Sequence, residues 1–432
     1  MSRSSDNGRL PKAGIRKEST LVPVAYNTGI RCYRAAVAIA SLRNRKARLM
    51  RRGHRKVWGI LDEKLSKGEK YVWIHTSSLG EFEQGRPLIE MIKRERPDLK
   101  VVLSFFSPSG YEVRKNFPLA DAVVYLPFDT PANVRRFLDM VNPVAAVFVK
   151  YEFWRNYLLE LRRRGVPTYL ISAVFRPKQL FFRPGGEWYR NLLFCFKEIY
   201  VQNLGSRLLL DGIGVSHVKV AGDTRFDRVT DIMRDSRDLP LLERFCRDSS
   251  FVFMAGSSWQ ADEAVYAEWL QNNPGVKAVI APHEFDAARV DKLKRLFGSA
   301  VAWTEAEKDP SLLEGKRVLV MDCFGLLSSA YRYATVAYVG GGFGAGIHNL
   351  NEAAVYGIPV LFGPNNRKFI EAKELMQCGG GFEVSDSAEL GDRMNELLGD
   401  KVMLASAGDA ARAYIESKLG ATEKIFGDIF RK

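Results

Sequence analysis

From Lys70 onward, short apolar segments alternate with longer segments whose apolar residues follow helical spacing. In residues 84–94, for example, Leu88, Ile89 and Ile92 recur on one helix face. This alternation predicts an α/β fold with parallel strands, because parallel neighbours need a crossover connection, usually a helix. The predicted strands are 71–75, 101–105, 122–125, 144–149, 168–171, 198–201 and 218–221 in the first half, then 251–255, 278–280, 318–321, 335–339 and 359–362 in the second.

The chain has 432 residues, which is too long for one compact core and indicates two domains. We expect two doubly wound Rossmann-like domains that face a central cleft, with ligands bound beyond the carboxyl ends of the strands. The predicted segments are a disordered N-terminus (1–20), a basic helix (21–60), an N-terminal domain (61–228), a linker (229–248) and a C-terminal domain (249–432). The last helix of the C-terminal domain is expected to cross back to the N-terminal domain.

The segment before the first strand is strongly basic. Between Ser19 and Leu61 there are ten lysines and arginines and no carboxylate, within a chain of net charge +14. Residues 30–61 are predicted as one helix with an apolar section and a basic tail. One interpretation is an interfacial helix on an anionic membrane surface; the alternative is a helix packed on its own domain with a solvated basic face. No aromatic and basic module follows, so nucleic acid is not an expected partner.

Neither the cysteines nor the histidines form a metal-ligand pattern. The five cysteines are scattered without a CxxC pair, which indicates free thiols in a reducing compartment. No HxxxH, DxD or GxSxG motif occurs. No apolar run reaches the roughly 20 residues of a membrane-spanning helix. We therefore expect no metal, no cofactor and no spanning segment.

Two predicted strand ends in the first half carry carboxylates. The turn after the first strand, at residues 76–80, contains the small residues Ser77, Ser78 and Gly80, and Glu81 and Glu83 open the helix that follows. Glu81 could act on a ligand held there, or it could only complement the helix dipole. Glu152 follows the fourth strand, and its alternative role is a pair with Lys150 or Arg155.

The second half has a glycine-rich turn after the strand at 335–339. Glycines at 340–346 precede a helix expected near Asn349, an arrangement that lets backbone N–H groups approach a phosphate. A loop that needs positive φ angles would look the same. Glu352 could bind ribose hydroxyls or complement the helix dipole, and His283 could contact a phosphate or a base or be a surface residue.

Several motifs, in this order, resemble those of the 3-deoxy-D-manno-octulosonic acid (Kdo) transferases of lipopolysaccharide synthesis, which have the GT-B architecture. The resemblance runs from about Arg51 to near the C-terminus. It is carried by residues 78–81, 107–110, 125–129, 152–154 and 222–227 in the first half, and by residues 255–258, 340–342, 348–352 and 360–364 in the second.

The resemblance implies inverting, metal-independent transfer of Kdo from CMP-Kdo to the lipid A precursor, an acylated disaccharide bisphosphate. It places the enzyme at the cytoplasmic face of the bacterial inner membrane. It implies Glu81 as the catalytic base, with Glu152 and Arg225 as further catalytic residues; the family normally has Lys where this chain has Arg225. The implied donor-binding residues are Ser257, Ser258, Pro282, His283, Phe324, Gly325, Leu326, Asn349, Leu350, Asn351 and Glu352.

Three donor-site motifs differ from the family pattern. The family's Pro-Arg-His is 282-PHE-284 here, its Met-Gly-Glu is 324-FGL-326, and its His-Asn-Pro-Leu-Glu is 348-HNLNE-352. Two other functions fit the sequence. One is a GT-B transferase or epimerase that uses a UDP-sugar; the other is a non-enzymatic protein that binds the membrane surface.

Overall fold

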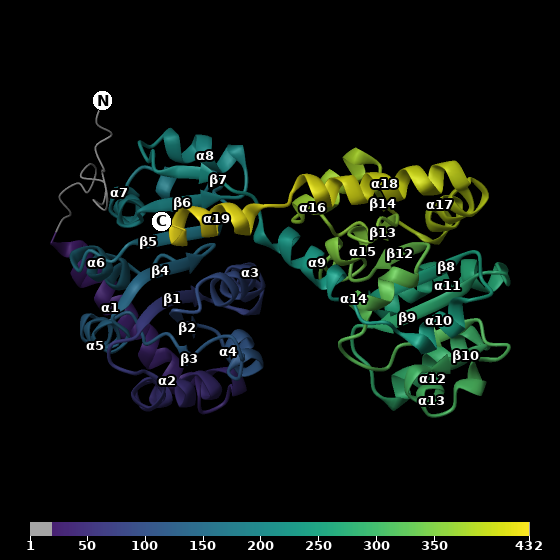
Figure 1. The fold of residues 1–432 in the computed structure, drawn as a ribbon, viewed down its shortest axis with the longest axis horizontal. Helices are drawn as coiled ribbons and strands as arrows, with labels where there is room; N and C mark the ends of the chain where they lie inside the picture. Colours follow the sequence, from purple (N-terminus) through teal and green to yellow (C-terminus); the bar gives the residue numbers. More distant parts are fainter. Residues whose placement is uncertain (1–19, 432) are drawn as a thin grey trace. The chain divides into compact units, whose positions relative to one another are not determined.

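The computed structural model describes residues 20–431, which form two compact units (Figure 1). Unit 1 contains residues 20–228 and 420–431, and unit 2 contains residues 229–419. The segment predicted as a linker lies in unit 2 and holds most of α9 (Thr224–Arg234) and all of α10 (Pro240–Cys246). The disorder expected for residues 1–20 concerns residues outside the described part, apart from Thr20.

Unit 1 is built on a parallel seven-stranded sheet in the order β3-β2-β1-β4-β5-β6-β7. The central strands β1 and β4 pair in parallel, with a register shift between Tyr71 and Val72 and with His75 opposite Phe148. The strand order reverses between them, so their carboxyl ends form the crevice where doubly wound sheets bind ligands. The strands are β1 (Lys70–Thr76), β2 (Leu99–Phe105), β3 (Ala122–Tyr125), β4 (Pro143–Val149), β5 (Thr168–Ala173), β6 (Glu198–Val201) and β7 (Val218–Val220).

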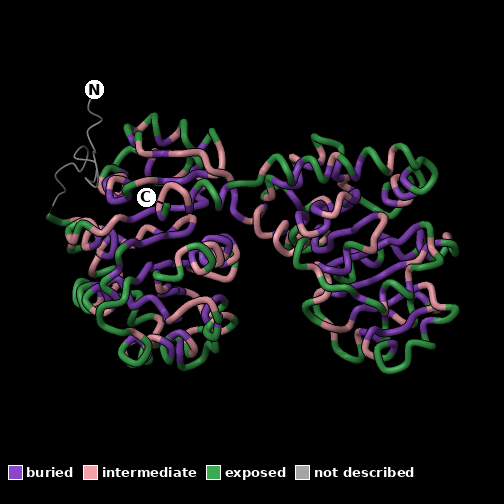
Figure 2. The backbone as a smooth tube through the Cα atoms, in the orientation of Figure 1, coloured by how far each residue is buried: buried purple, intermediate pink, exposed green. Residues whose placement is uncertain are grey.

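Helices cover both faces of this sheet. Trp73 of β1 is fully buried, and its ring lies 5.0–5.3 Å from those of Phe137, Phe148 and Tyr157, which joins the sheet to α5 and α6. Figure 2 shows the buried backbone running along the strands. The covering helices are α3 (Leu79–Glu95), α4 (Pro108–Arg114), α5 (Pro131–Val141), α6 (Arg155–Arg163), α7 (Glu187–Arg190), α8 (Leu204–Asp211) and α19 (Ala421–Phe430), with the 3-10 helices η1 (Leu180–Phe182) and η2 (Asn191–Cys195).

The basic N-terminal segment forms two helices, α1 (Leu21–Ala40) and α2 (Arg45–Lys64), so the prediction of one helix over residues 30–61 is wrong. The chain bends at residues 41–44, where Asn44 is extended and its side chain caps α2 by accepting from the Ala47 N–H. Arg48 donates to the carbonyls of Ser41 and Leu42 and fixes this corner.

Helix α2 is a structural part of unit 1. Its buried face consists of Met50, Gly53, Val57 and Leu61, and it packs against β3. At Gly53 the close approach requires glycine, because a Cβ atom there would lie 2.0 Å from Cε2 of Tyr125. Within residues 20–431, no helix combines the length and the apolar character needed to cross a membrane.

Unit 2 repeats the architecture with the strand order β10-β11-β9-β8-β12-β13-β14. All its strand pairs are parallel, and the order reverses between β8 and β12. The strands are β8 (Val252–Ser258), β9 (Lys277–Pro282), β10 (Ala300–Ala302), β11 (Val318–Val320), β12 (Val336–Val339), β13 (Val360–Phe362) and β14 (Gly381–Glu383).

The helices of unit 2 connect and flank these strands. Helices α16 and α18 pack against each other, as do α11 and α17. The helices are α11 (Gln260–Asn272), α12 (Ala287–Phe297), α13 (Trp303–Lys308), α14 (Leu327–Ala330), α15 (Asn351–Ala354), α16 (Ile370–Cys378), α17 (Ser387–Gly399) and α18 (Lys401–Ser417), with the 3-10 helices η3 (Pro310–Leu313) and η4 (Tyr331–Tyr333).

The predicted α/β class with two doubly wound sheets is confirmed, and every predicted strand is present within three residues of its ends. The strands β10 and β14 were not predicted. Each has only three residues and lies at a sheet edge.

Candidate functional site

Strained backbone marks the carboxyl ends of the central strands in both sheets. Three residues other than glycine have positive φ angles there: Lys150 (68°) after β4, Ser172 (52°) in β5 and Ser257 (52°) in β8. Ser172 and Ser257 sit at register shifts in their strands. Positive φ costs energy for such residues and persists where the surroundings enforce it, most often at functional sites. These strand ends are therefore the first places to search.

Glu81 lies in the first turn of α3, directly beyond β1. Its Oε2 atom accepts from the backbone N–H of Ser78 at 3.0 Å and from the Ser78 hydroxyl, which completes a capping box. Glu81 is half-buried. Among residues 20–431, no hydrogen bond engages its Oε1 atom and no cation pairs with it, whereas Glu83 pairs with Arg114 at 2.9 Å. The capping contact thus leaves one oxygen of Glu81 available.

Glu152 ends a buried hydrogen-bond chain. Within residues 20–431 its carboxylate forms no ion pair with a lysine or an arginine, so the expected alternative of a pair with Lys150 or Arg155 is not seen. His75 Nε2 lies 3.0 Å from its Oε2 atom, and the Trp154 indole N–H donates to the same oxygen at 2.6 Å. The Nδ1 atom of His75 lies 2.9 Å from the Ser104 hydroxyl. Because Trp73 donates to that hydroxyl at 2.8 Å, the hydroxyl can donate to Nδ1. The Trp154 indole N–H also donates to Nε2 at 3.1 Å, and Nδ1 lies 3.2 Å from the Ser104 carbonyl oxygen, so His75 is held at both ring nitrogens.

Arg225 stands at the start of α9 and pairs with Asp223. Its guanidinium donates to Oδ2 of Asp223 at 2.7 and 2.9 Å, and its backbone N–H donates to Oδ1. Gln84 and Gln202 donate to the same carboxylate. Burial raises the pKa of Asp223, but the Arg225 charge and these hydrogen bonds outweigh burial and hold the pKa below its usual value. Asp223 stays ionised and orients Arg225.

The Tyr151 phenol lies in the electric field of several of these charged groups. Burial is the largest cause of the raised pKa of this phenol. Smaller effects come from nearby charges: Arg176 and Arg225 lower the pKa, while Glu81 and Asp223 raise it. All four charged residues are therefore close enough to act on one hydroxyl. The structure brings Glu81 and Arg225 into one neighbourhood at the carboxyl edge of the unit 1 sheet.

In unit 2, three rings stack at the carboxyl ends of the strands. The His283 ring stacks on both Trp259 and His348, with ring centroids 4.6 and 4.4 Å away. The Trp259 indole donates to Nε2 of His348 at 3.2 Å. Burial, and then the neighbouring His283, lower the pKa of His348, so its imidazole is held neutral. A pocket of about 390 Å³ opens beside Trp259, Phe285 and Arg289.

The glycine-rich turn is required by close packing of the backbone. A Cβ atom at Gly340 would lie 2.4 Å from the Ser257 carbonyl oxygen, and one at Gly342 would lie 2.5 Å from Gly363. Gly341 also has a φ angle of 94°. Of the two interpretations offered by the sequence, the need for special backbone geometry accounts for these glycines without any phosphate.

The expected helix near Asn349 begins later and is short. Helix α15 has only four residues, so its dipole is small, and a phosphate site at its N-terminus is not supported. Asn349 donates to Glu352 at 3.0 Å. Asn351 is buried, and no partner within the described structure engages its side-chain oxygen or nitrogen.

The other predicted donor residues are spread along the same sheet edge. Ser258 is buried and bonded to the Tyr266 hydroxyl at 2.7 Å, Pro282 ends β9, and Leu350 is buried. Phe324 is 81% exposed and its ring lies 4.6 Å from that of Phe285. The segment continues through Gly325, with a φ angle of 84°, to Leu326 before α14.

Sequence reasoning missed the residues that support these groups, namely His75, Tyr151, Asp223 and Trp259. His75 lies inside a predicted strand, where its partners on β2 and beyond β4 depend on sheet register. Asp223 stands in a motif that was recognised, but its pairing with Arg225 was not foreseen. Among residues 20–431, no cluster of His, Cys, Asp and Glu could hold a metal ion.

Residues 44–228 match the family model described as 3-deoxy-D-manno-octulosonic-acid transferase (kdotransferase). Named 3-deoxy-D-manno-octulosonic acid transferases align with most of the chain. The protein from Aquifex aeolicus is 29% identical over 78% of this chain and 89% of its own length. Those from Bordetella pertussis and Haemophilus influenzae are 28% and 24% identical, each over 82% of this chain and 85% of their own length.

Solved structures confirm the fold. The UDP-GlcNAc 2-epimerase of Neisseria meningitidis aligns with a TM-score of 0.60 and 15% identity, over 84% of this chain and all of that chain. MurG of Acinetobacter baumannii aligns with a TM-score of 0.53 and 12% identity over the same shares. At these identities the likeness concerns the GT-B fold alone.

Proposed function

The chain belongs to the 3-deoxy-D-manno-octulosonic acid (Kdo) transferase family, and from that premise we propose that it transfers Kdo from CMP-Kdo to the lipid A precursor. It is a glycosyltransferase of lipopolysaccharide biosynthesis. The donor, the acceptor and the roles of individual residues are the proposed part. The observation that carries them is the half-buried Glu81 beyond β1, with one carboxylate oxygen available and a charged neighbourhood around it.

Glu81 is the general base of the proposed reaction. An acceptor hydroxyl oxygen attacks the anomeric carbon of Kdo, and its proton passes to Oε1 of Glu81. The new carbon–oxygen bond forms as the bond to the CMP phosphate oxygen breaks, and CMP leaves as a phosphate monoester. Direct displacement inverts the anomeric configuration. A positioned base contributes about 10²–10⁴-fold to the rate.

Glu152 and Arg225 support this chemistry. The carboxylate of Glu152 is held by His75 and Trp154, so it keeps one orientation at the end of β4. Arg225 is oriented by Asp223 and retains exposed surface on its side chain (33%). It supplies positive charge toward the donor phosphate as that group becomes more anionic. Its pair with Asp223 neutralises part of that charge, which limits its contribution.

Unit 2 supplies the donor site in this proposal. The Trp259, His283 and His348 rings offer a flat surface for a pyrimidine base, and Asn351 has side-chain donors and acceptors without partners in the described structure. Glu352 accepts from the Asn349 amide at 3.0 Å, and in this proposal its carboxylate also accepts from ribose hydroxyls. The exposed basic face of α2 brings the enzyme to the cytoplasmic face of the inner membrane, where the acceptor lies.

The decisive experiment compares two variants of the α3 capping box. Glu81→Gln keeps the box, because glutamine fills the same capping position, but it removes the base. Ser78→Ala weakens the cap by about 1 kcal/mol and keeps the carboxylate. We expect Glu81→Gln to lose at least about 10²-fold in Kdo transfer with normal CMP-Kdo binding, and Ser78→Ala to retain most activity. Near-normal transfer by Glu81→Gln would refute the base assignment.

The donor is tested separately with the unaltered enzyme. CMP-Kdo and UDP-sugars are each supplied with the lipid A precursor, and mass spectrometry counts the sugars added to the lipid. The proposal requires transfer from CMP-Kdo alone. Turnover of a UDP-sugar in place of CMP-Kdo would favour the alternative transferase or epimerase function.

A further inference from the structure

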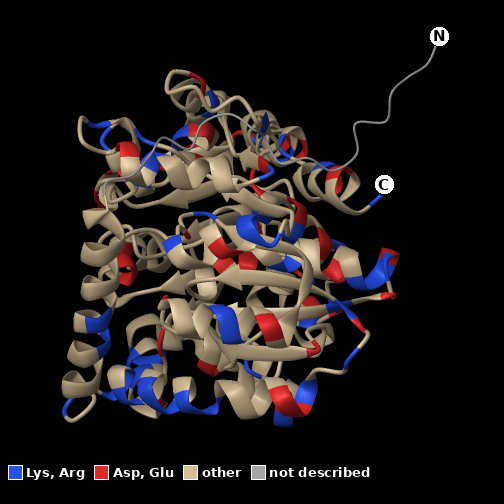
Figure 3. Cartoon of the chain, turned by 90° about the vertical axis from the view of Figure 1, so that its left-hand side faces the viewer, with Lys and Arg blue, Asp and Glu red and all other residues tan. Residues whose placement is uncertain are grey.

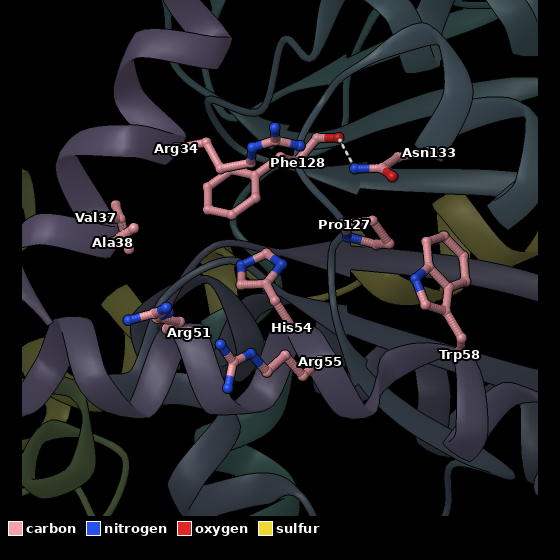
Figure 4. Close-up of a pocket in the computed structure, with 10 residues that line it drawn as sticks. All are labelled: Arg34, Val37, Ala38, Arg51, His54, Arg55, Trp58, Pro127, Phe128 and Asn133. Carbon is pink, nitrogen blue, oxygen red and sulfur yellow. Dashed lines mark hydrogen bonds between the residues drawn. The ribbon is translucent and has the colours of Figure 1, made fainter.

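A pocket of about 510 Å³ lies between α1, α2 and the segment after β3, and neither Glu81 nor Glu152 lines it (Figure 4). This volume is within the usual range of small-ligand sites. Its lining, which we call the α1–α2 pocket, consists of Arg34, Val37 and Ala38 from α1, Arg51, His54, Arg55 and Trp58 from α2, and Pro127, Phe128 and Asn133.

The polar side of the α1–α2 pocket is cationic. Arg34, Arg51 and Arg55 line it, and no aspartate or glutamate does. Within residues 20–431 none of the three arginines pairs with a carboxylate; Arg51 donates only to the Ser41 hydroxyl. Guanidinium groups bind phosphate through paired hydrogen bonds, so a site with three of them fits an anionic phosphate group.

His54 gives a further indication that the pocket binds a polar group. Figure 4 shows its ring rising from α2 toward Phe128, and the two rings stack 4.2 Å apart. Its Nε2 atom is buried and has no hydrogen-bond partner in the described structure. Buried polar atoms are normally satisfied, so this nitrogen indicates a group that the pocket can accept.

The other side of the pocket leads to an exposed apolar surface. Val37, Ala38 and Phe128 form its apolar wall, and Leu42 follows Ala38 by four residues, about one helical turn. Helix α1 has no buried residue, and the exposed apolar residues that we call the α1 stripe are Leu21, Val24 and Ile39 of α1 together with Leu42 in the turn that follows it. Ile39 and Leu42 are 71% and 72% exposed.

Basic residues flank this stripe on the neighbouring helix. Figure 3 shows lysines and arginines gathered along the lower edge of unit 1, where Figure 1 places α2. An apolar helix beside a basic one is typical of a surface that lies in the membrane interface. The three arginines, the apolar wall of the pocket and the membrane-like surface beside it together favour a ligand that has both a phosphate group and acyl chains.

We propose that the α1–α2 pocket binds one anionic phospholipid molecule of the membrane, with its phosphate between the three arginines and an acyl chain along Ala38 toward the α1 stripe. The inference rests on the proposed action at a membrane surface. It differs from general attraction to negative charge, because it assigns a saturable site to named side chains.

The test measures binding of dihexanoyl-phosphatidylglycerol, below its critical micelle concentration, to the full chain by calorimetry. We expect one lipid per chain. Dihexanoyl-phosphatidylcholine and sn-glycerol 3-phosphate should each bind at least about tenfold more weakly, because the first lacks net charge and the second lacks chains. Equal affinity for sn-glycerol 3-phosphate would replace the lipid by a free phosphate and overturn the proposal.

Two pocket variants and one matched control locate the site. Arg34→Gln/Arg51→Gln/Arg55→Gln removes the cations, and Ala38→Trp fills the pocket without changing charge. The control Arg43→Gln/Arg45→Gln/Lys46→Gln loses three charges from exposed residues outside the pocket. Both pocket variants should bind at least about tenfold more weakly and the control within about twofold of the unaltered chain.

Equal losses in the control and the triple pocket variant would reduce the effect to bulk electrostatics and overturn the proposal. Unchanged binding by Ala38→Trp, checked for native folding by circular dichroism, would do the same. Because no donor or acceptor is present, the result is independent of Kdo transfer. If the chain bound the lipid but had no transferase activity, the lipid site would be supported and the proposed function would be refuted.

Discussion

At the scale of single residues, the candidate site depends on how charged and polar groups are held. Glu81 is held by its own helix, whereas Glu152 is held by His75 and Trp154 from elsewhere in the sheet. A carboxylate with two donors on one oxygen keeps a fixed orientation. The two acidic residues thus differ in the kind of support they have, and their replacement should have different effects.

Replacing Glu152 by Gln should lower Kdo transfer by about 10²-fold, because loss of the charge weakens the contacts with His75 and Trp154 and disturbs the geometry of the strand end. Steady-state kinetics of transfer measure this effect, and a thermal unfolding curve verifies the fold. Trp154→Phe is the matched control, since it removes one donor and keeps the carboxylate; it should lose less activity. Equal activities for Glu152→Gln and the unaltered enzyme would exclude a role for Glu152.

His54 makes stability depend on pH. Burial lowers the pKa of its imidazole from 6.5 to about 4, so the folded protein keeps it neutral. The stability it contributes is complete above pH 6.5 and is lost as pH falls toward 4, because the unfolded chain then binds a proton that the folded chain does not. Between pH 7 and pH 5 the unaltered chain should lose about 2 kcal/mol more than His54→Phe.

Denaturant unfolding at the two pH values measures this difference. Phenylalanine preserves the stack on Phe128 and does not titrate, so it isolates the contribution of the imidazole. Parallel pH curves for the two proteins would show that His54 titrates normally in the folded state.

At the scale of elements, packing overrides the local pattern of the N-terminal segment. Its composition indicates one long basic helix, but Asn44 caps a second helix, and α2 buries a face against β3. The cap could be found in the sequence, since asparagine is a strong N-cap residue. The corner also needs Arg48, whose bonds to the Ser41 and Leu42 carbonyls exist only once the helices meet.

Two glycines of α2 should respond in opposite directions to replacement by alanine. Gly53→Ala places a Cβ atom 2.0 Å from the Tyr125 ring and should destabilise unit 1 by about 1–3 kcal/mol. Gly59→Ala meets nothing within 4 Å and should stabilise it by about 0.5–1 kcal/mol, because alanine favours the helix. Equilibrium unfolding gives both values; destabilisation by both would show that α2 packs differently.

At the scale of the whole molecule, each unit has its own sheet and core, and α19 ties the end of the chain to unit 1. Ile425, Phe426 and Phe430 of α19 are buried in the unit 1 core. The side chain of Asp227 accepts from the N–H groups of Gly420 and Thr422, which starts this helix in place. Unit 1 is therefore assembled from segments about 200 residues apart.

Phe426→Ala should lower the free energy of unfolding of unit 1 by about 3–5 kcal/mol and leave that of unit 2 unchanged, because the substitution leaves a cavity in the unit 1 core only. Calorimetry can follow both transitions. In the same experiment, CMP should raise only the transition of unit 2, where we assign the donor site. A CMP effect confined to unit 1 would reverse the assignment of the donor site, and a single shared transition would show that the units unfold together.

The amino-acid sequence by itself determined the α/β class, the interior strands of both sheets and the positions of the strand-end carboxylates, because apolar periodicity and turn residues are local signals. Only the tertiary structure decided that His75 supports Glu152, that Asp223 holds Arg225, and that two helices frame the α1–α2 pocket. These contacts join residues through sheet register and helix packing. A one-residue change of register would redirect every side chain of a strand, so no local pattern can specify them.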